Sequence, residues 1–132
     1  MIAIDTNVLP RAMLDDDPVQ SPAARLFLQT LTQQHPGYVG VPVMLEFFWV
    51  LRSSLRLLRR EIVTSIFELF GVDTLVFEES DILIRSLRYF EMEGIDFSDA
   101  VIAQRHARDG CQRTVTFDRK AAACIPSMEF LA

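Results

Sequence analysis

Apolar residues occur along the chain in two alternating patterns: short continuous runs and longer stretches with helical spacing. Short apolar runs bounded by turn residues are typical of buried strands. The runs are IAI at 2–4, YVGV at 38–41, TLVF at 74–77, TVTF at 114–117 and MEFL at 128–131. We therefore expect four to five strands.

The stretches between these runs carry apolar residues three or four positions apart, which is the spacing of an amphipathic helix. This spacing predicts helices over 22–34, 42–58, 60–70, 80–93 and 97–108. Strands separated by helices of this length pair in parallel through βαβ crossovers. We expect a three-layer α/β/α fold with a central, mainly parallel sheet of four to five strands, formed as one domain over residues 1–132.

Composition places the chain among globular proteins. Half of its 132 residues are hydrophobic and 23% are charged, which fits one folded domain. No run approaches the roughly 20 apolar residues of a membrane span, and the N-terminus lacks the pattern of a signal peptide, so we expect a cytoplasmic protein. Cys111 and Cys124 form no CxxC motif and His35 and His106 are isolated, which favours reduced thiols over a zinc site.

Acidic residues follow several of the predicted strands. Asp5 and Asp118 directly follow the first and fourth strands, Glu46 lies four residues past Pro42, and Asp96 and Asp99 stand at the start of a helix. Ligand sites of parallel sheets lie beyond the carboxyl ends of the strands. We therefore expect these carboxylates at one edge of the sheet.

Each carboxylate also has a local explanation, and both readings stay open. Asp5 and Asp96 have the residue type of helix N-caps, and Asp99 suits the first turn of a helix, where acids favour the macrodipole. Asp118 suits a turn. Glu46 is harder to explain locally, because a charge on a mostly apolar helix is costly without a partner.

Gathered carboxylates repel one another and therefore favour a bound cation. Carboxylate oxygens are typical ligands of Mg²⁺, and such an ion can activate water and stabilise charge on a phosphodiester. The net charge of −5 by itself argues against a nucleic-acid partner. A bound divalent ion reverses the local field and removes much of that objection.

Four arginines and three aromatic residues are candidates for contacts with partners. Arg52, Arg56, Arg59 and Arg60 have the spacing i, i+4, i+7 and i+8, which predicts one helix face. That face is either a solvated surface or a surface for RNA phosphates or an acidic partner. Phe47, Phe48 and Trp49 are consecutive, so some enter the core while part of that surface can meet a second subunit or a partner helix.

Taken together, four segments resemble the PIN domain family, and within it the VapC-type ribonuclease toxins of toxin–antitoxin pairs. The segments are IDTNVL at 4–9, VPVMLEFFWVL with Glu46, DFSDAVIA at 96–103 and TFD at 116–118. Their order and approximate spacing agree across residues 2–131. After TFD the family often continues with a further acid and an aromatic residue, whereas this chain reads RKAAA, a departure that concerns the last short helix.

The resemblance implies a Mg²⁺- or Mn²⁺-dependent endoribonuclease that cleaves RNA phosphodiester bonds. It assigns the catalytic and metal-binding roles to Asp5, Glu46, Asp99 and Asp118. It assigns supporting roles to Asp96, and to Thr6, Asn7 and Thr116 as side chains that orient the carboxylates. It also implies a homodimer and a cognate VapB-type antitoxin.

Three alternative functions remain open at this point. A phosphatase of the haloacid-dehalogenase kind also has an Asp after its first strand, but it normally has a second Asp where this chain has Asn7. A receiver domain has an adjacent acidic pair after strand one, whereas Asp5 is followed by Thr6. The third alternative is a non-catalytic PIN module that only binds partners.

Overall fold

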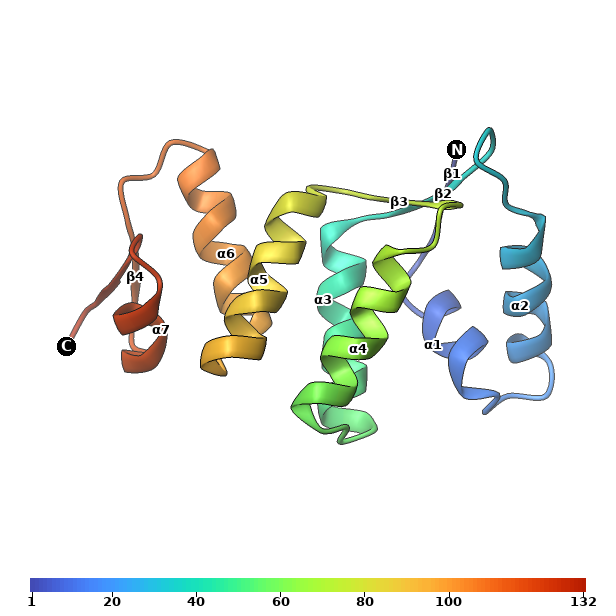
Figure 1. Cartoon of the computed structure of the whole chain (residues 1–132), viewed down its shortest axis with the longest axis horizontal. Coiled ribbons are helices and arrows are strands. Elements are labelled where there is room, and N and C mark those ends of the chain that lie inside the picture. Colours follow the sequence, from blue (N-terminus) through green and yellow to red (C-terminus); the bar gives the residue numbers. More distant parts are fainter. The chain divides into compact units, whose positions relative to one another are not determined.

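The computed structural model describes residues 1–132, which form two compact units, Met1–Glu78 and Glu79–Ala132. Figure 1 shows the course of the chain, with the first unit drawn from blue to yellow-green and the second from yellow to red. Each unit is described by itself. None of the helices is both long enough and apolar enough to span a membrane.

The first unit contains three strands and five helical segments. In chain order they are β1 (Ile2–Ala3), α1 (Val8–Leu14), α2 (Gln20–Thr30), β2 (Gly37–Val39), α3 (Val41–Trp49), the π-helix η1 (Val50–Ser54), α4 (Arg59–Phe70) and β3 (Leu75–Phe77). The strands form a parallel sheet in the order β1-β2-β3. Two local features begin its helices: Pro42 occupies the first turn of α3, and the Glu61 carboxylate accepts a hydrogen bond from Leu58 N at the start of α4.

Gly37 allows the middle strand β2 to lie close to its neighbours. A Cβ atom at this position would lie 2.7 Å from Ile4 Cδ1 and 2.8 Å from Leu31 Cδ1. Both distances are shorter than a carbon–carbon contact allows, so any side chain here would displace the core of this unit. The glycine therefore fixes how tightly the sheet packs at the strand that leads into α3.

The second unit contains α5 (Ser80–Glu93), α6 (Phe97–Arg108), β4 (Thr114–Thr116), α7 (Arg119–Cys124) and β5 (Met128–Phe130). Strands β4 and β5 are parallel, and α5 packs against α6. A buried apolar cluster joins α6, α7 and β5. Its members are Ile95, Ala100, Ala103, Ala121, Ile125 and Met128.

Ion pairs connect the beginning of α5 with the end of α6. Asp81 binds Arg108, and this hydrogen bond lowers the pKa of Asp81 to about 2. Glu79 binds Arg105 Nε at 3.1 Å and Arg108 Nη1 at 3.4 Å. The preceding residue, Glu78, is anchored within the first unit, where its Oε1 accepts a hydrogen bond from Val41 N at 2.7 Å.

The predicted α/β fold with parallel strands is confirmed. All five apolar runs contain a strand, although the strands form one sheet of three and one of two. The helices expected over 22–34, 60–70, 80–93 and 97–108 are present with small shifts at their ends. The apolar spacing did not predict the seven-residue α1, which has Pro10 in its first turn, and the six-residue α7 was expected only through the family resemblance.

The prediction that Arg52, Arg56, Arg59 and Arg60 share one helix face is wrong. The helix that starts at Val41 widens into the π-helix η1, where Leu55 N donates to Val50 O at 3.0 Å. Arg56 then has a left-handed backbone with φ of 53°. Arg52 thus lies in η1, Arg56 in a turn, and Arg59 and Arg60 in the first turn of α4.

Candidate active site

Asp5 lies just beyond β1, where the sequence predicts a functional carboxylate. It is exposed, and Thr6 Oγ1 donates a long hydrogen bond to Asp5 Oδ1 at 3.5 Å. The N-cap of α1 is Asn7, whose side chain makes no capping hydrogen bond. Asp5 is therefore not the side-chain cap of this helix, and its carboxylate is available to a ligand.

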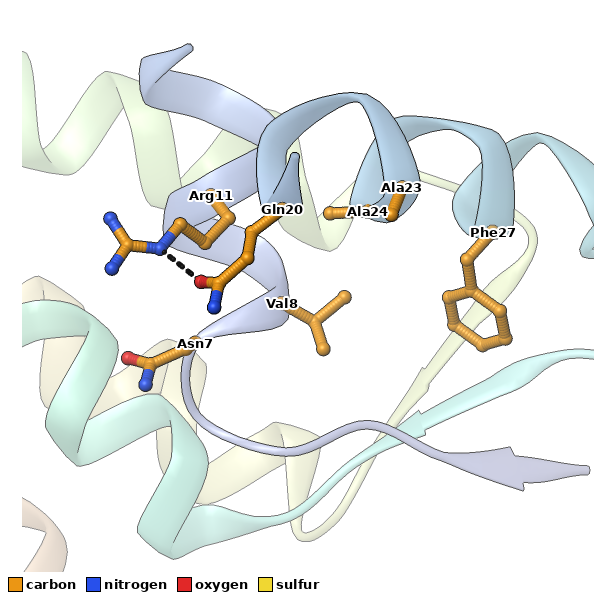
Figure 2. A pocket seen from close by; sticks show the side chains of 7 residues that line it. All are labelled: Asn7, Val8, Arg11, Gln20, Ala23, Ala24 and Phe27. Carbon is orange, nitrogen blue, oxygen red and sulfur yellow. Dashed lines mark hydrogen bonds between the residues drawn. The ribbon is translucent and has the colours of Figure 1, made fainter. Parts of the chain in front are cut away.

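A cavity lies beside Asn7, between α1 and α2, and sequence analysis did not predict it. Figure 2 shows that Val8 and Phe27 line its apolar part, and that the Arg11 and Gln20 side chains meet at one side. Arg11 Nε donates to Gln20 Oε1 at 2.8 Å. The cavity has a volume of about 320 Å³, and no sequence motif marks it, because it depends on how α1 packs against α2.

Glu46 lies on the exposed side of α3. Its neighbours Met44 and Phe47 are completely buried, whereas Glu46 itself is exposed to solvent. The helix is therefore apolar on the side that enters the core, and the charge of Glu46 carries no burial cost. Of the three consecutive aromatic residues on this helix, Phe47 and Phe48 are buried, and Trp49 is 57% exposed.

Asp96 and Asp99 stand at the start of α6 and have different surroundings. Asp96 is the N-cap, and its Oδ1 accepts a hydrogen bond from Ser98 N at 2.9 Å. Asp99 lies in the first helical turn and is half-buried. Burial raises the pKa of Asp99, and the negative charges of Asp96 and Asp118 raise it further.

Asp118 is held in place at the end of β4. Its Oδ1 accepts a hydrogen bond from Ala121 N at 2.9 Å and so caps α7. Thr116 Oγ1 accepts a hydrogen bond from Asp118 N at 3.0 Å. Thr116 therefore orients the backbone of Asp118 rather than its carboxylate.

The structure brings together three of the predicted carboxylates in the second unit. The charges of Asp96, Asp99 and Asp118 interact, while Asp5 and Glu46 belong to the first unit. No group of three or more His, Cys, Asp or Glu side chains is arranged to hold a metal ion. The raised pKa of Asp99 beside two further carboxylates nevertheless fits the chemistry of a cation site, because a divalent ion would relieve the repulsion.

The arginines, the cysteines and His106 are not members of this carboxylate group. All four arginines, Arg52, Arg56, Arg59 and Arg60, are exposed. Cys111 and Cys124 are free thiols, and His106 Nδ1 shares a hydrogen bond of 3.0 Å with the Thr114 hydroxyl.

Comparison with known proteins identifies the family. The family model of the PIN domain matches residues 2–124, which include all the predicted acidic residues, and no curated protein matches the chain. PIN domains are generally nucleases that act on nucleic acids and typically use divalent metal ions. Since the match covers nearly the whole sequence, the chain belongs to the PIN domain family.

Proposed function

We propose that this PIN domain is a divalent-metal-dependent endoribonuclease and the toxin of a VapBC-type toxin–antitoxin pair. The observation that carries the nuclease proposal is the match of the PIN domain model to residues 2–124. The environment of Asp99 supports it, because two further carboxylates disfavour the charge of this half-buried side chain. A cation at this place would offset that cost.

Asp5, Glu46, Asp99 and Asp118 are the proposed ligands of Mg²⁺ or Mn²⁺. Their hard carboxylate oxygens suit either ion. When bound, the ion would lower the pKa of water and stabilise charge on the phosphodiester. Asp96, Thr116, Thr6 and Asn7 are proposed to support this set. Asp96 and Thr116 bind the backbone N–H groups of Ser98 and Asp118, and Thr6 and Asn7 directly follow Asp5 in the sequence.

An RNA cleavage assay tests the proposal. Purified protein is incubated with labelled total RNA in Mg²⁺, in Mn²⁺ and in excess EDTA, beside an Asp5→Asn variant. We expect cleavage in either metal and none in EDTA or with Asp5→Asn. Glu68→Gln is the matched control, because Glu68 is an exposed acid on α4 of the same unit and its loss should leave cleavage unchanged.

Cleavage that persists in excess EDTA would contradict the metal-dependent mechanism. A folded wild type that cleaves no RNA would instead favour the non-catalytic PIN module. Binding of beryllofluoride in the presence of Mg²⁺ would favour the phosphatase or receiver alternatives, since both form a phosphoaspartate that this anion mimics.

The toxin role and its partners need separate experiments. We propose a homodimer that is silenced by a VapB-type antitoxin. Induced expression should arrest growth of a bacterial host, and expression of Asp5→Asn at the same level should not. Light scattering after size-exclusion chromatography should give twice the monomer mass of 15.1 kDa. Growth arrest by both proteins would show that toxicity does not depend on cleavage and would contradict a toxin that acts by cutting RNA.

Arg52, Arg56, Arg59 and Arg60 are proposed to contact RNA phosphates or an acidic partner. Each phosphate contact that is lost reduces the salt dependence of RNA binding, with a change in slope of about 0.7 for single strands. Arg60→Ala should therefore weaken RNA binding and flatten its dependence on salt. An unchanged slope would leave Arg60 as a solvated residue of α4.

A further inference from the structure

Phe117 is an exposed aromatic residue that the proposed metal site does not use. It lies between β4 and Asp118, and 72% of its surface is accessible to solvent. Leu131 lies at the same end of this sheet, because its N–H donates to the Thr116 carbonyl at 2.9 Å, and it is 56% exposed. The carboxyl end of β4 thus presents an apolar surface directly beside a candidate catalytic carboxylate.

The backbone around Phe117 is fixed on both sides. The residue before it, Thr116, is held by the hydrogen bond from Leu131 N and itself binds Asp118 N through Oγ1. The residue after it, Asp118, caps α7. Little backbone freedom remains for Phe117 to lose when a ligand binds, so the ring is presented in a preorganised position.

Positive charge follows immediately in the sequence. Lys120 is exposed and makes no ion pair, and Arg119 stacks over the Phe130 ring with its guanidinium carbon 4.1 Å from the ring centroid. An aromatic ring beside cations is the arrangement by which proteins bind single-stranded nucleic acids, since bases stack on the ring and phosphates meet the cations. An apolar protein segment could pack against the ring, but it would provide no partners for the charges of Asp118, Arg119 and Lys120.

We propose that Phe117 stacks against an unpaired base of the RNA strand next to the cleaved phosphodiester. This inference rests on the proposed function, because Asp118 must belong to the active site for the base to lie near the reaction. Phe117 is then a residue that positions and selects substrate, without a role in bond cleavage.

The test measures binding of a short labelled single-stranded RNA by fluorescence anisotropy in Mg²⁺, in the Asp5→Asn background that prevents cleavage. Phe117→Ala should weaken binding by about fivefold or more, the effect of losing one stacked base. Phe117→Trp should bind as well as the parent or better. Leu131→Ala is the matched control, because it removes an exposed apolar side chain from the same place without removing a ring, and it should leave binding unchanged.

A second readout follows the ring directly. Trp49 is the only tryptophan, so a Trp49→Phe, Phe117→Trp protein carries one reporter at the proposed platform. Its fluorescence should be quenched by single-stranded RNA and much less by duplex RNA of the same sequence. No quenching by either RNA would overturn the proposal.

Other outcomes also decide the question. Equal losses of RNA binding for Phe117→Ala and Leu131→Ala would overturn the stacking proposal, because they would show that apolar area in general, and not the ring, contacts the RNA. A lower melting temperature for both Phe117→Ala and Phe117→Trp would show that the ring packs within the fold. If Phe117→Ala cleaves RNA as fast as wild type and with the same KM, this inference alone is overturned. A wild type that neither cleaves nor binds RNA would overturn the proposed function as well.

Discussion

Asp99 is the residue whose surroundings most disfavour its own charge. Because its pKa is raised, the favourable contribution of Asp99 to stability is fully present below its unfolded pKa of about 3.9. That contribution is lost as the pH rises through the folded pKa. At neutral pH the ionised carboxylate therefore destabilises the metal-free protein.

The destabilising effect of ionised Asp99 predicts how the stability of Asp99→Asn changes with pH. In EDTA, the variant should melt at a higher temperature than wild type at pH 7 and at nearly the same temperature at pH 4. Mg²⁺ or Mn²⁺ should then stabilise wild type more than the variant, because a ligand that binds only the folded state raises its stability. Thermal melts over pH 4–8 measure both effects, and equal melting temperatures at every pH would contradict the assigned environment of Asp99.

Asp118 combines a structural role with its proposed catalytic one, and two variants separate them. Asn is as good an N-cap as Asp, so Asp118→Asn should keep the free energy of unfolding, while Asp118→Ala should lower it by about 1 kcal/mol. RNA cleavage should be lost in both. The loss should exceed the roughly 10- to 100-fold typical when only the hydrogen-bond partner of a metal ligand is removed. An Asn variant that cleaves like wild type would leave Asp118 as a cap only.

The elements show where sequence patterns are informative and where they are not. The five strands follow from continuous apolar runs, and most helices from spacing that ends at Gly71, Gly94 or Gly110. The break between η1 and α4 has no such signal. LRSSLRLL contains neither glycine nor proline, and the left-handed Arg56 depends on how the buried residues on either side pack.

The relative stabilities of glycine and valine variants at Arg56 test this break between η1 and α4. A left-handed backbone costs an L-residue roughly 1–2 kcal/mol, and a β-branched side chain tolerates it worst. Arg56→Gly should therefore unfold at a higher urea concentration than Arg56→Val. At Arg60, within α4, the order should reverse, because glycine costs about 1 kcal/mol relative to alanine in a helix and valine costs less. If valine were the more stable variant at both positions, Arg56 would lie in a continuous helix.

At the scale of the whole molecule, the carboxylates that the sequence aligns with one family belong to two units. The positions of these acids after strands and at helix starts predict which residues are involved. The N-cap role of Asp96 follows from its place at a helix start, whereas Asp118 was expected in a turn and instead caps α7. The distances within a metal site depend on tertiary packing that no periodicity encodes. The cavity beside Asn7 and the exposure of Phe117 depend on packing in the same way.

We predict that the two units fold as a single PIN domain. Urea unfolding followed by Trp49 fluorescence reports on the first unit, and far-ultraviolet circular dichroism reports on the helices of both. For one cooperative domain the two midpoints should coincide. Separate midpoints would show that Met1–Glu78 and Glu79–Ala132 unfold independently.

The adjacent glutamates at the junction of the units have a consequence for metal affinity. Glu78 is tied to the start of α3 and Glu79 to the end of α6, so each of these two residues is held within its own unit. The proposed ligands Asp5 and Glu46 precede this point in the sequence and Asp99 and Asp118 follow it, so the length of chain here sets the effective concentration of one pair around the other. A glycine–serine insertion between Glu78 and Glu79 should raise the Mg²⁺ concentration needed for half-maximal cleavage, although every carboxylate is retained.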